Sequence, residues 1–118
     1  MPEPTRYKDI FKHLKARGVD VYAPAQAKGE CKQPYTVIKE AGGAQHAALS
    51  TAQQLYDIMC YVPKDRYSQL DEYAGQIKGH MKGLEPMINP THFTTSSFYD
   101  DTVKAHMISI QYYNYRKI

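Results

Sequence analysis

A chain of 118 residues is the size of one domain, and we expect residues 1–118 to form a single domain around one core. With 42% apolar and 23% charged residues, the composition excludes a disordered chain, and a net charge of +3 without dense Lys/Arg clusters argues against a module that reads nucleic-acid sequence. No segment approaches the ~18 apolar residues that span a bilayer, and no signal peptide is expected, so the sequence favours synthesis in a cytoplasm and no membrane association.

Two helices are predicted from apolar residues at helical spacing. The first covers about residues 5–17, with Thr5 placed to cap its start and Gly18 to end it. Its apolar stripe consists of Tyr7, Ile10, Phe11 and Leu14. The second covers about residues 66–83, with Ser68 as the expected N-cap. Its stripe consists of Leu70, Tyr73, Ala74, Ile77, Met81 and Leu84.

Alternating and β-branched residues predict a sheet between and after these helices. The expected strands cover residues 19–22, 34–39, 53–63, 91–99 and 102–115. The glycine-rich segment 41–44 is expected to end the second strand, and Asp100-Asp101 to form the turn of the last hairpin. Neither face of strand 53–63 is fully polar, so we expect both faces to be covered, the outer one by a helix or by a neighbouring subunit.

The order helix, β-hairpin, helix, β-hairpin predicts an α+β fold, in which two helices pack on an antiparallel sheet of about four strands. The core is expected to contain Ile10, Phe11, Leu14, Ile58, Cys60, Leu70, Ile77, Met81, Ile108 and Ile110. Two loops, residues 23–33 and 41–52, are either plain surface connections or segments that become ordered on a partner.

The sequence contains no motif of a phosphate-binding loop, a dinucleotide site, a zinc protease or a serine hydrolase. His92 and His106 could meet across the last hairpin, but no third metal ligand is evident beside them. Cys60 follows the core pattern and Cys31 lies in a loop between lysines that could lower its pKa; both are expected to be free thiols. Asp100-Asp101 is more typical of a turn than of an acid–base pair. We therefore expect no enzyme activity and no catalytic, cofactor-binding or metal-binding residues.

Tyrosine is unusually frequent, with 11 Tyr against 3 Phe and no Trp. Its apolar ring and polar tip suit a protein–protein contact, although tyrosine is also a common strand residue. The residues expected at a protein interface are Tyr61, Tyr112, Tyr113 and Tyr115. Stacking on nucleic acid beside Arg116-Lys117 is a weaker alternative, because consecutive residues of a strand point to opposite faces.

Four segments of this chain resemble the tail terminator, or tail-completion, proteins of phages and prophages of Gram-positive bacteria. They are residues 7–14, 29–39, 56–63 and 99–112. The resemblance covers most of the chain in order, and its motifs are structural rather than catalytic. It implies a small α+β subunit that forms a hexameric ring at the head-proximal end of the tail tube.

The resemblance also implies partners and a location. The ring would end tube polymerisation and offer a docking face to the head connector, so the expected partners are copies of this chain, tail tube protein, neck proteins and, in a contractile tail, sheath protein. DNA would pass through the lumen without being read. The chain would belong to the virion tail or neck and assemble in the host cytoplasm. The alternatives are another neck component, such as a head-completion or stopper protein, and a nucleic-acid-binding module.

Overall fold

The computed structural model describes residues 5–26, 29–45 and 51–117, which form two α-helices and a six-stranded sheet. In chain order the elements are α1 (Tyr7–Ala16), β1 (Val21–Tyr22), β2 (Tyr35–Gln45), β3 (Thr51–Pro63), α2 (Leu70–Met81), β4 (Asn89–Thr94), β5 (Phe98–Asp100) and β6 (Ala105–Lys117). Short 3₁₀ turns, Tyr67–Gln69 and Lys82–Leu84, flank α2.

The α+β class and the order of helices and hairpins are confirmed, whereas the expected count of about four strands was too low. The sheet order is β1-β2-β3-β6-β4, and β5 also pairs with β6. The short β1 adds a parallel strand at one edge, and all other pairs are antiparallel. The predicted strand 91–99 is two strands, because the register against β6 shifts between Pro90 and Thr94 and no strand covers residues 95–97.

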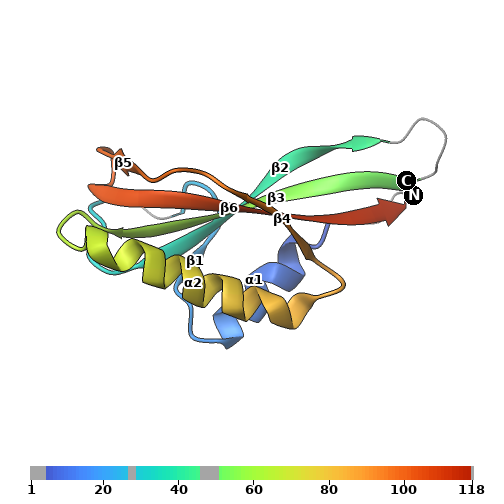
Figure 1. Cartoon of the computed structure of the whole chain (residues 1–118), viewed down its shortest axis with the longest axis horizontal. Helices are drawn as coiled ribbons and strands as arrows, with labels where there is room; N and C mark the ends of the chain where they lie inside the picture. Colours follow the sequence, from blue (N-terminus) through green and yellow to red (C-terminus); the bar gives the residue numbers. More distant parts are fainter. Residues whose placement is uncertain (1–4, 27–28, 46–50, 118) are drawn as a thin grey trace.

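The two longest strands, β3 and β6, pair along their full length from Thr51↔Lys117 to Pro63↔Ala105. Their alternation directs one set of side chains toward the helices, and both helices lie on that side of the sheet (Figure 1). The core on this side combines Ile10, Leu14, Ile38, Tyr56, Ile58, Cys60, Ala74, Ile77, Met81, Ile88, Ile110 and Tyr112 with a few neighbours. Of the predicted core residues, Phe11 and Ile108 are only partly buried at its margin.

The opposite face of the sheet carries a second apolar cluster at one end. It contains Cys31, Tyr35, Val37, Tyr61, Ala105 and Met107. The Tyr35 and Tyr61 rings stack with centroids 4.8 Å apart, and the Cys31 backbone N–H donates to the Val103 carbonyl over 2.7 Å. The prediction that both faces of strand 53–63 are covered is therefore confirmed at this end, and the covering residues belong to the chain itself.

The expected break at residues 41–44 is wrong, because β2 continues to Gln45. A register shift between Glu40 and Gly43 makes a bulge there, with Gly42 at a φ of +81°. A Cβ on Gly43 would overlap the Gln53 carbonyl of the neighbouring strand, so the glycines permit close pairing rather than ending it. The remainder of the predicted loop, residues 46–50, lies outside the described residues.

Gly18 ends α1 as predicted, directly after Arg17 and at a φ of +83°, but both predicted N-caps are wrong. Arg6 occupies the N-cap position of α1, and the Thr5 hydroxyl instead donates to Glu40 Oε1 over 2.7 Å. Ser68 lies within the 3₁₀ turn before α2, whose N-cap position is held by Gln69 without a side-chain bond. Local side-chain capping is therefore replaced by a tertiary contact at the start of α1 and by a 3₁₀ turn at the start of α2.

The domain is elongated, measuring 49 × 25 × 24 Å. Strands β2, β3 and β6 run past the ends of both helices and form a projecting end of the sheet, which we call the sheet extension (Figure 1). The extension comprises the second half of β2, the first half of β3 and the second half of β6.

Two neighbouring substitutions in α1 separate the core from its margin. Ile10 is fully buried, so Ile10→Ala should lower the free energy of unfolding by ~2–5 kcal/mol. Phe11 is only partly buried, so Phe11→Ala should cost less, ~1–2 kcal/mol, because part of its ring is already in water. Urea denaturation measures both. Equal losses for the two variants would contradict this division of the helix.

Candidate assembly surfaces

The four tyrosines expected at an interface differ sharply in exposure. Tyr61 is 9% and Tyr112 is 4% exposed, and each lies in one of the two apolar clusters. These two residues lack the free surface that a contact with another molecule needs, and the prediction is corrected for them. Tyr113 is half-buried and Tyr115 is 55% exposed, so both retain accessible ring surface.

Tyr113 and Tyr115 lie on the outer face of the sheet extension. Their rings meet edge to face with centroids 5.5 Å apart. Leu55 is opposite Tyr113 across the β3–β6 pair, and it is half-buried. We call Leu55, Tyr113 and Tyr115 the extension patch. The second apolar cluster of the same face lies at the other end of these strands, so the extension patch is separate from it.

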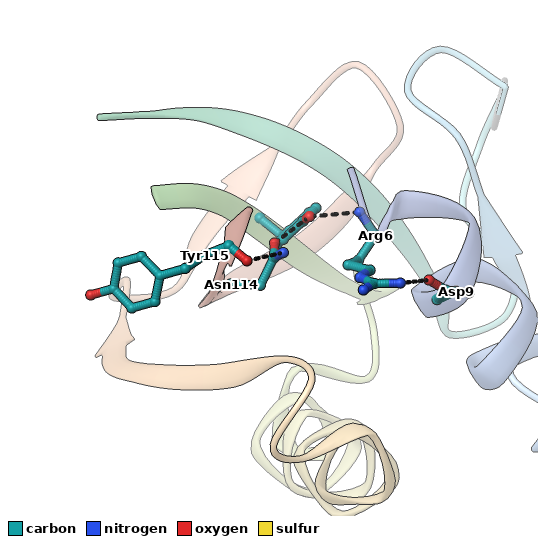
Figure 2. A network of polar contacts seen from close by, with 5 residues as sticks. Arg6, Asp9, Asn114 and Tyr115 are labelled. Carbon is teal, nitrogen blue, oxygen red and sulfur yellow. Dashed lines mark hydrogen bonds and ion pairs between the residues drawn. The ribbon is translucent and has the colours of Figure 1, made fainter. Parts of the chain in front are cut away.

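A hydrogen-bonded network ties the extension to the start of α1 (Figure 2). The buried Tyr56 hydroxyl accepts from the Arg6 backbone N–H over 2.8 Å and donates to Asn114 Oδ1 over 2.6 Å. Asn114 Nδ2 in turn donates to the Tyr115 carbonyl over 3.3 Å. Because these polar atoms are removed from water, losing any partner is costly, and the network therefore holds the strand that carries Tyr115.

Sequence reasoning did not find this network, although one signal was present. Gln54, Tyr56 and Asn114 occupy positions whose alternation points them to the helix side of the sheet. Gln54 is 6% exposed, and its Nε2 donates to the Gly42 carbonyl over 2.9 Å. Polar residues at core-facing positions near the end of a long strand indicate a polar layer where the apolar core stops.

A shallow depression lies between α1, the turn after β1, and β2. It consists of two adjoining parts of about 450 and 420 Å³ that share Tyr7 and Ala23. We call it the α1 hollow; its lining residues are Tyr7, Lys8, Phe11, Lys12, Ala23, Pro24, Gln26, Lys39 and Glu40. The turn itself is held by a hydrogen bond from the Ala23 N–H to Gln26 Oε1 over 2.7 Å.

The α1 hollow combines an apolar floor with a basic rim. The Tyr7 and Phe11 rings pack at a centroid distance of 6.1 Å, and the Lys15 ammonium lies 5.6 Å from the Phe11 centroid. The Tyr7 hydroxyl is buried without a hydrogen-bond partner among the described residues. Burial, and secondarily the charge of Glu40, raises the pKa of Tyr7, so this hydroxyl stays a neutral donor.

A second feature is the tip formed by Phe98, Tyr99, Asp100 and Asp101, which we call the acidic turn. Phe98 is 51% and Tyr99 42% exposed, and both belong to β5, which pairs with β6. Asp100 Oδ1 accepts from the Thr102 N–H over 3.0 Å and so fixes the turn. The prediction of a turn at Asp100-Asp101 is confirmed in position, with the turn extending to Lys104.

The acidic turn is supported from the side by aromatic residues. The His106 ring packs against Tyr67 at 4.8 Å and against Tyr99 at 5.2 Å between centroids. The His106 Nε2 is 3.1 Å from the Lys64 carbonyl oxygen, which fixes the ring as a hydrogen-bond donor there. His92 lies elsewhere, because its strand pairs with β6 at Ile110–Tyr113, while His106 pairs with Tyr99. The predicted meeting of the two histidines is therefore wrong.

Within the described part of the chain, no group of three or more His, Cys, Asp or Glu side chains is arranged to hold a metal ion. Both cysteines are free, as expected, and Cys60 is buried in the main core as predicted. Cys31 was expected in a loop but is also buried, on the opposite face of the sheet. Cys31 donates to the Gln33 carbonyl, and burial raises the pKa of its thiol. Of the two alternatives for Cys31, a thiol activated by flanking lysines is wrong, because desolvation outweighs the Gln33 hydrogen bond and the charge of Arg66, which act in the opposite direction.

The pH at which the Cys60 thiol ionises depends on its burial in the core. Burial raises the pKa of its thiol from 9.0 to about 12. Between these values the thiol ionises in the unfolded chain but not in the folded one, so stability present below pH 9 is lost as the pH rises. In Cys60→Ala, the fall in unfolding free energy between pH 9 and pH 11 should be smaller than in the native chain by ~2 kcal/mol.

Chemical denaturation at the two pH values measures this difference. Ser109→Ala is the matched control, since Ser109 is buried in the neighbouring strand but does not titrate in this range. An equally steep alkaline loss in Cys60→Ala and the native chain would contradict the burial of the thiol.

The loop expected at residues 23–33 has two structural roles. Ala23, Pro24 and Gln26 line the α1 hollow, and Cys31 packs on the outer face of the sheet. The described helices include none that is both long and apolar enough to cross a bilayer.

Comparison with known proteins finds no family model and no curated protein that matches this chain.

Proposed function

We propose that this chain is a structural subunit of a phage-type tail, which forms a ring on the head-proximal end of the tail tube and ends its polymerisation. The sheet extension with its exposed aromatic patch is the observation that carries the proposal. A ring subunit has to contact two neighbouring subunits and, in addition, the tube below and the connector above. An elongated domain with a projecting strand end is suited to such contacts.

The extension patch has the composition of an interface centre. Exposed tyrosine rings dominate the energy of many protein contacts, because they bury a large area at a small cost in side-chain entropy. The network through Tyr56 and Asn114 holds the patch in place before docking, which reduces the ordering cost of association. We assign the patch to the contact with tail tube protein.

The α+β architecture supports the ring proposal over the stopper alternative, which calls for an all-β barrel. The nucleic-acid alternative predicts an affinity for DNA that falls steeply with salt, with a slope that counts the phosphates contacted. In the terminator proposal, DNA only passes through the lumen, so binding to DNA at physiological salt should be weak and insensitive to sequence.

Tube assembly in vitro tests the proposal. Purified tail tube protein of the same particle should polymerise to uncontrolled lengths alone and stop at shorter lengths when this chain is added in small molar amounts. Tyr113→Ser/Tyr115→Ser should weaken capping by ~30-fold or more, as expected when interface aromatic anchors are lost. Sedimentation of the tubes measures their length.

Phe93→Ser is the matched control, because Phe93 is 56% exposed but is not part of the extension patch; it lies in β4, which pairs with β6 beside Tyr113. It should cap as the native chain does. If tubes reach the same lengths with and without this chain, the terminator proposal is wrong; if both variants cap normally, the extension patch is not the tube contact.

A further inference from the structure

We propose that copies of this chain associate head to tail, with the acidic turn of one copy docked in the α1 hollow of the next. This inference rests on the ring proposed above and names the surfaces that join its subunits. It uses two features that sequence reasoning did not connect: a basic, apolar depression and an acidic, aromatic projection on the same chain.

The hollow requires an acidic and aromatic occupant. Lys8, Lys12 and Lys39 line it against one carboxylate, Glu40, which already accepts a hydrogen bond from Thr5. Between the lysines, the floor is made of aromatic and small apolar side chains, and covering this apolar surface with a partner is favourable. A segment that brings both a ring and a carboxylate satisfies the floor and the rim together.

The floor also lacks a hydrogen-bond acceptor. The Tyr7 hydroxyl is buried and has no hydrogen-bond partner among the described residues, and such a group carries a desolvation cost until a partner oxygen is supplied. Tyr7 lines both parts of the hollow. A carboxylate or carbonyl that docks there would supply the missing acceptor once the Tyr7 ring turns toward it.

The acidic turn presents the matching groups. Phe98 and Tyr99 expose about half of their surface, and Asp101 projects beyond them with its side chain 81% exposed. Asp101 does pair with Lys104 over 2.9 Å, but exposed ion pairs of this kind contribute little and exchange partners readily. Since β5 is paired with β6, the turn is a fixed projection rather than a loose loop.

A second copy is the occupant that the geometry favours. The turn and the hollow share no residue, and Figure 1 shows β5 at one end of the long axis and α1 near the middle on the helix-covered side, so one copy cannot satisfy its own hollow. A bound pair leaves one turn and one hollow open, on different copies. Such heterologous contacts extend until a rotation closes them into a ring.

Charge also selects this arrangement over the alternatives. Turn against hollow places carboxylates beside lysines, whereas hollow against hollow or turn against turn would oppose like charges. A single turn in a shallow hollow is smaller than the ~800 Å² per partner of a standard interface, so each contact should be weak in solution. Closure of the ring, or docking on a tube, then supplies the remaining stability.

The experiment uses two variants with complementary defects. Lys8→Glu/Lys12→Glu reverses two charges of the hollow and keeps the turn, while Phe98→Ser/Asp101→Asn removes one of the turn's two rings and one of its two carboxylates and keeps the hollow. All four positions are exposed, so the substitutions should leave the fold intact, and circular dichroism checks this. Each variant alone should self-associate at least tenfold more weakly than the native chain.

Mixing the two variants gives the decisive result. One intact hollow and one intact turn remain between them, so the mixture should form a heterodimer of one copy each and nothing larger. Sedimentation velocity at concentrations up to about 1 mM measures this, a range that detects contacts as weak as a millimolar dissociation constant. Lys64→Glu/Phe93→Ser, with the same types of change at exposed sites outside both features, should associate as the native chain does.

Three outcomes would overturn the contact: a native chain that stays monomeric throughout this range, variants that associate as the native chain does, or a mixture without a heterodimer. Tube capping separates this result from the proposed function. If the native chain caps tubes but the mixture shows no heterodimer, the ring proposal stands with other subunit contacts. If a heterodimer forms but no tube is capped, the contact stands and the tail function fails.

Discussion

The pairing of β3 with β6 is the constraint on which the rest of the structure depends. Because the two 13-residue strands are in register along their whole length, their alternation assigns every side chain of the central sheet to one face. One face receives both helices and the main core, and the other receives Cys31 and its neighbours at one end only. Because β3 and β6 run past the ends of the helices, they also create the sheet extension, and the candidate tube contact is a direct consequence of this pairing.

Much of this fold could be predicted from the residues themselves. The stripe around Ile10 and Leu14 and the strand 53–63 have strong periodicities, and the structure confirms both elements. The errors occurred where tertiary contacts override local signals. Gly42 and Gly43 indicate a break in isolation, but in the sheet they make a bulge that lets β2 continue beside Gln53. Thr5 has the chemistry of a cap, but its hydroxyl donates to Glu40 instead.

The candidate surfaces could be predicted only in part. Alternation alone cannot separate an exposed outer face from one that the chain covers itself, so Tyr61 and Tyr113 were equally plausible as interface residues. The structure separates them, because Cys31 and Val103 cover the end of the sheet that carries Tyr61. The α1 hollow and the acidic turn depend on residues distant in sequence, and periodicity carries no information about which of them meet.

The central claim is that this chain closes into a ring at the end of a tail tube. Electron microscopy of tail tubes incubated with the chain tests it most directly, with end-on views to reveal symmetry. The account predicts one extra ring of density at one end of each tube, a single subunit layer thick and rotationally symmetric with the tube. Density along the tube walls, added layers that continue to grow, or bare tube ends would contradict it.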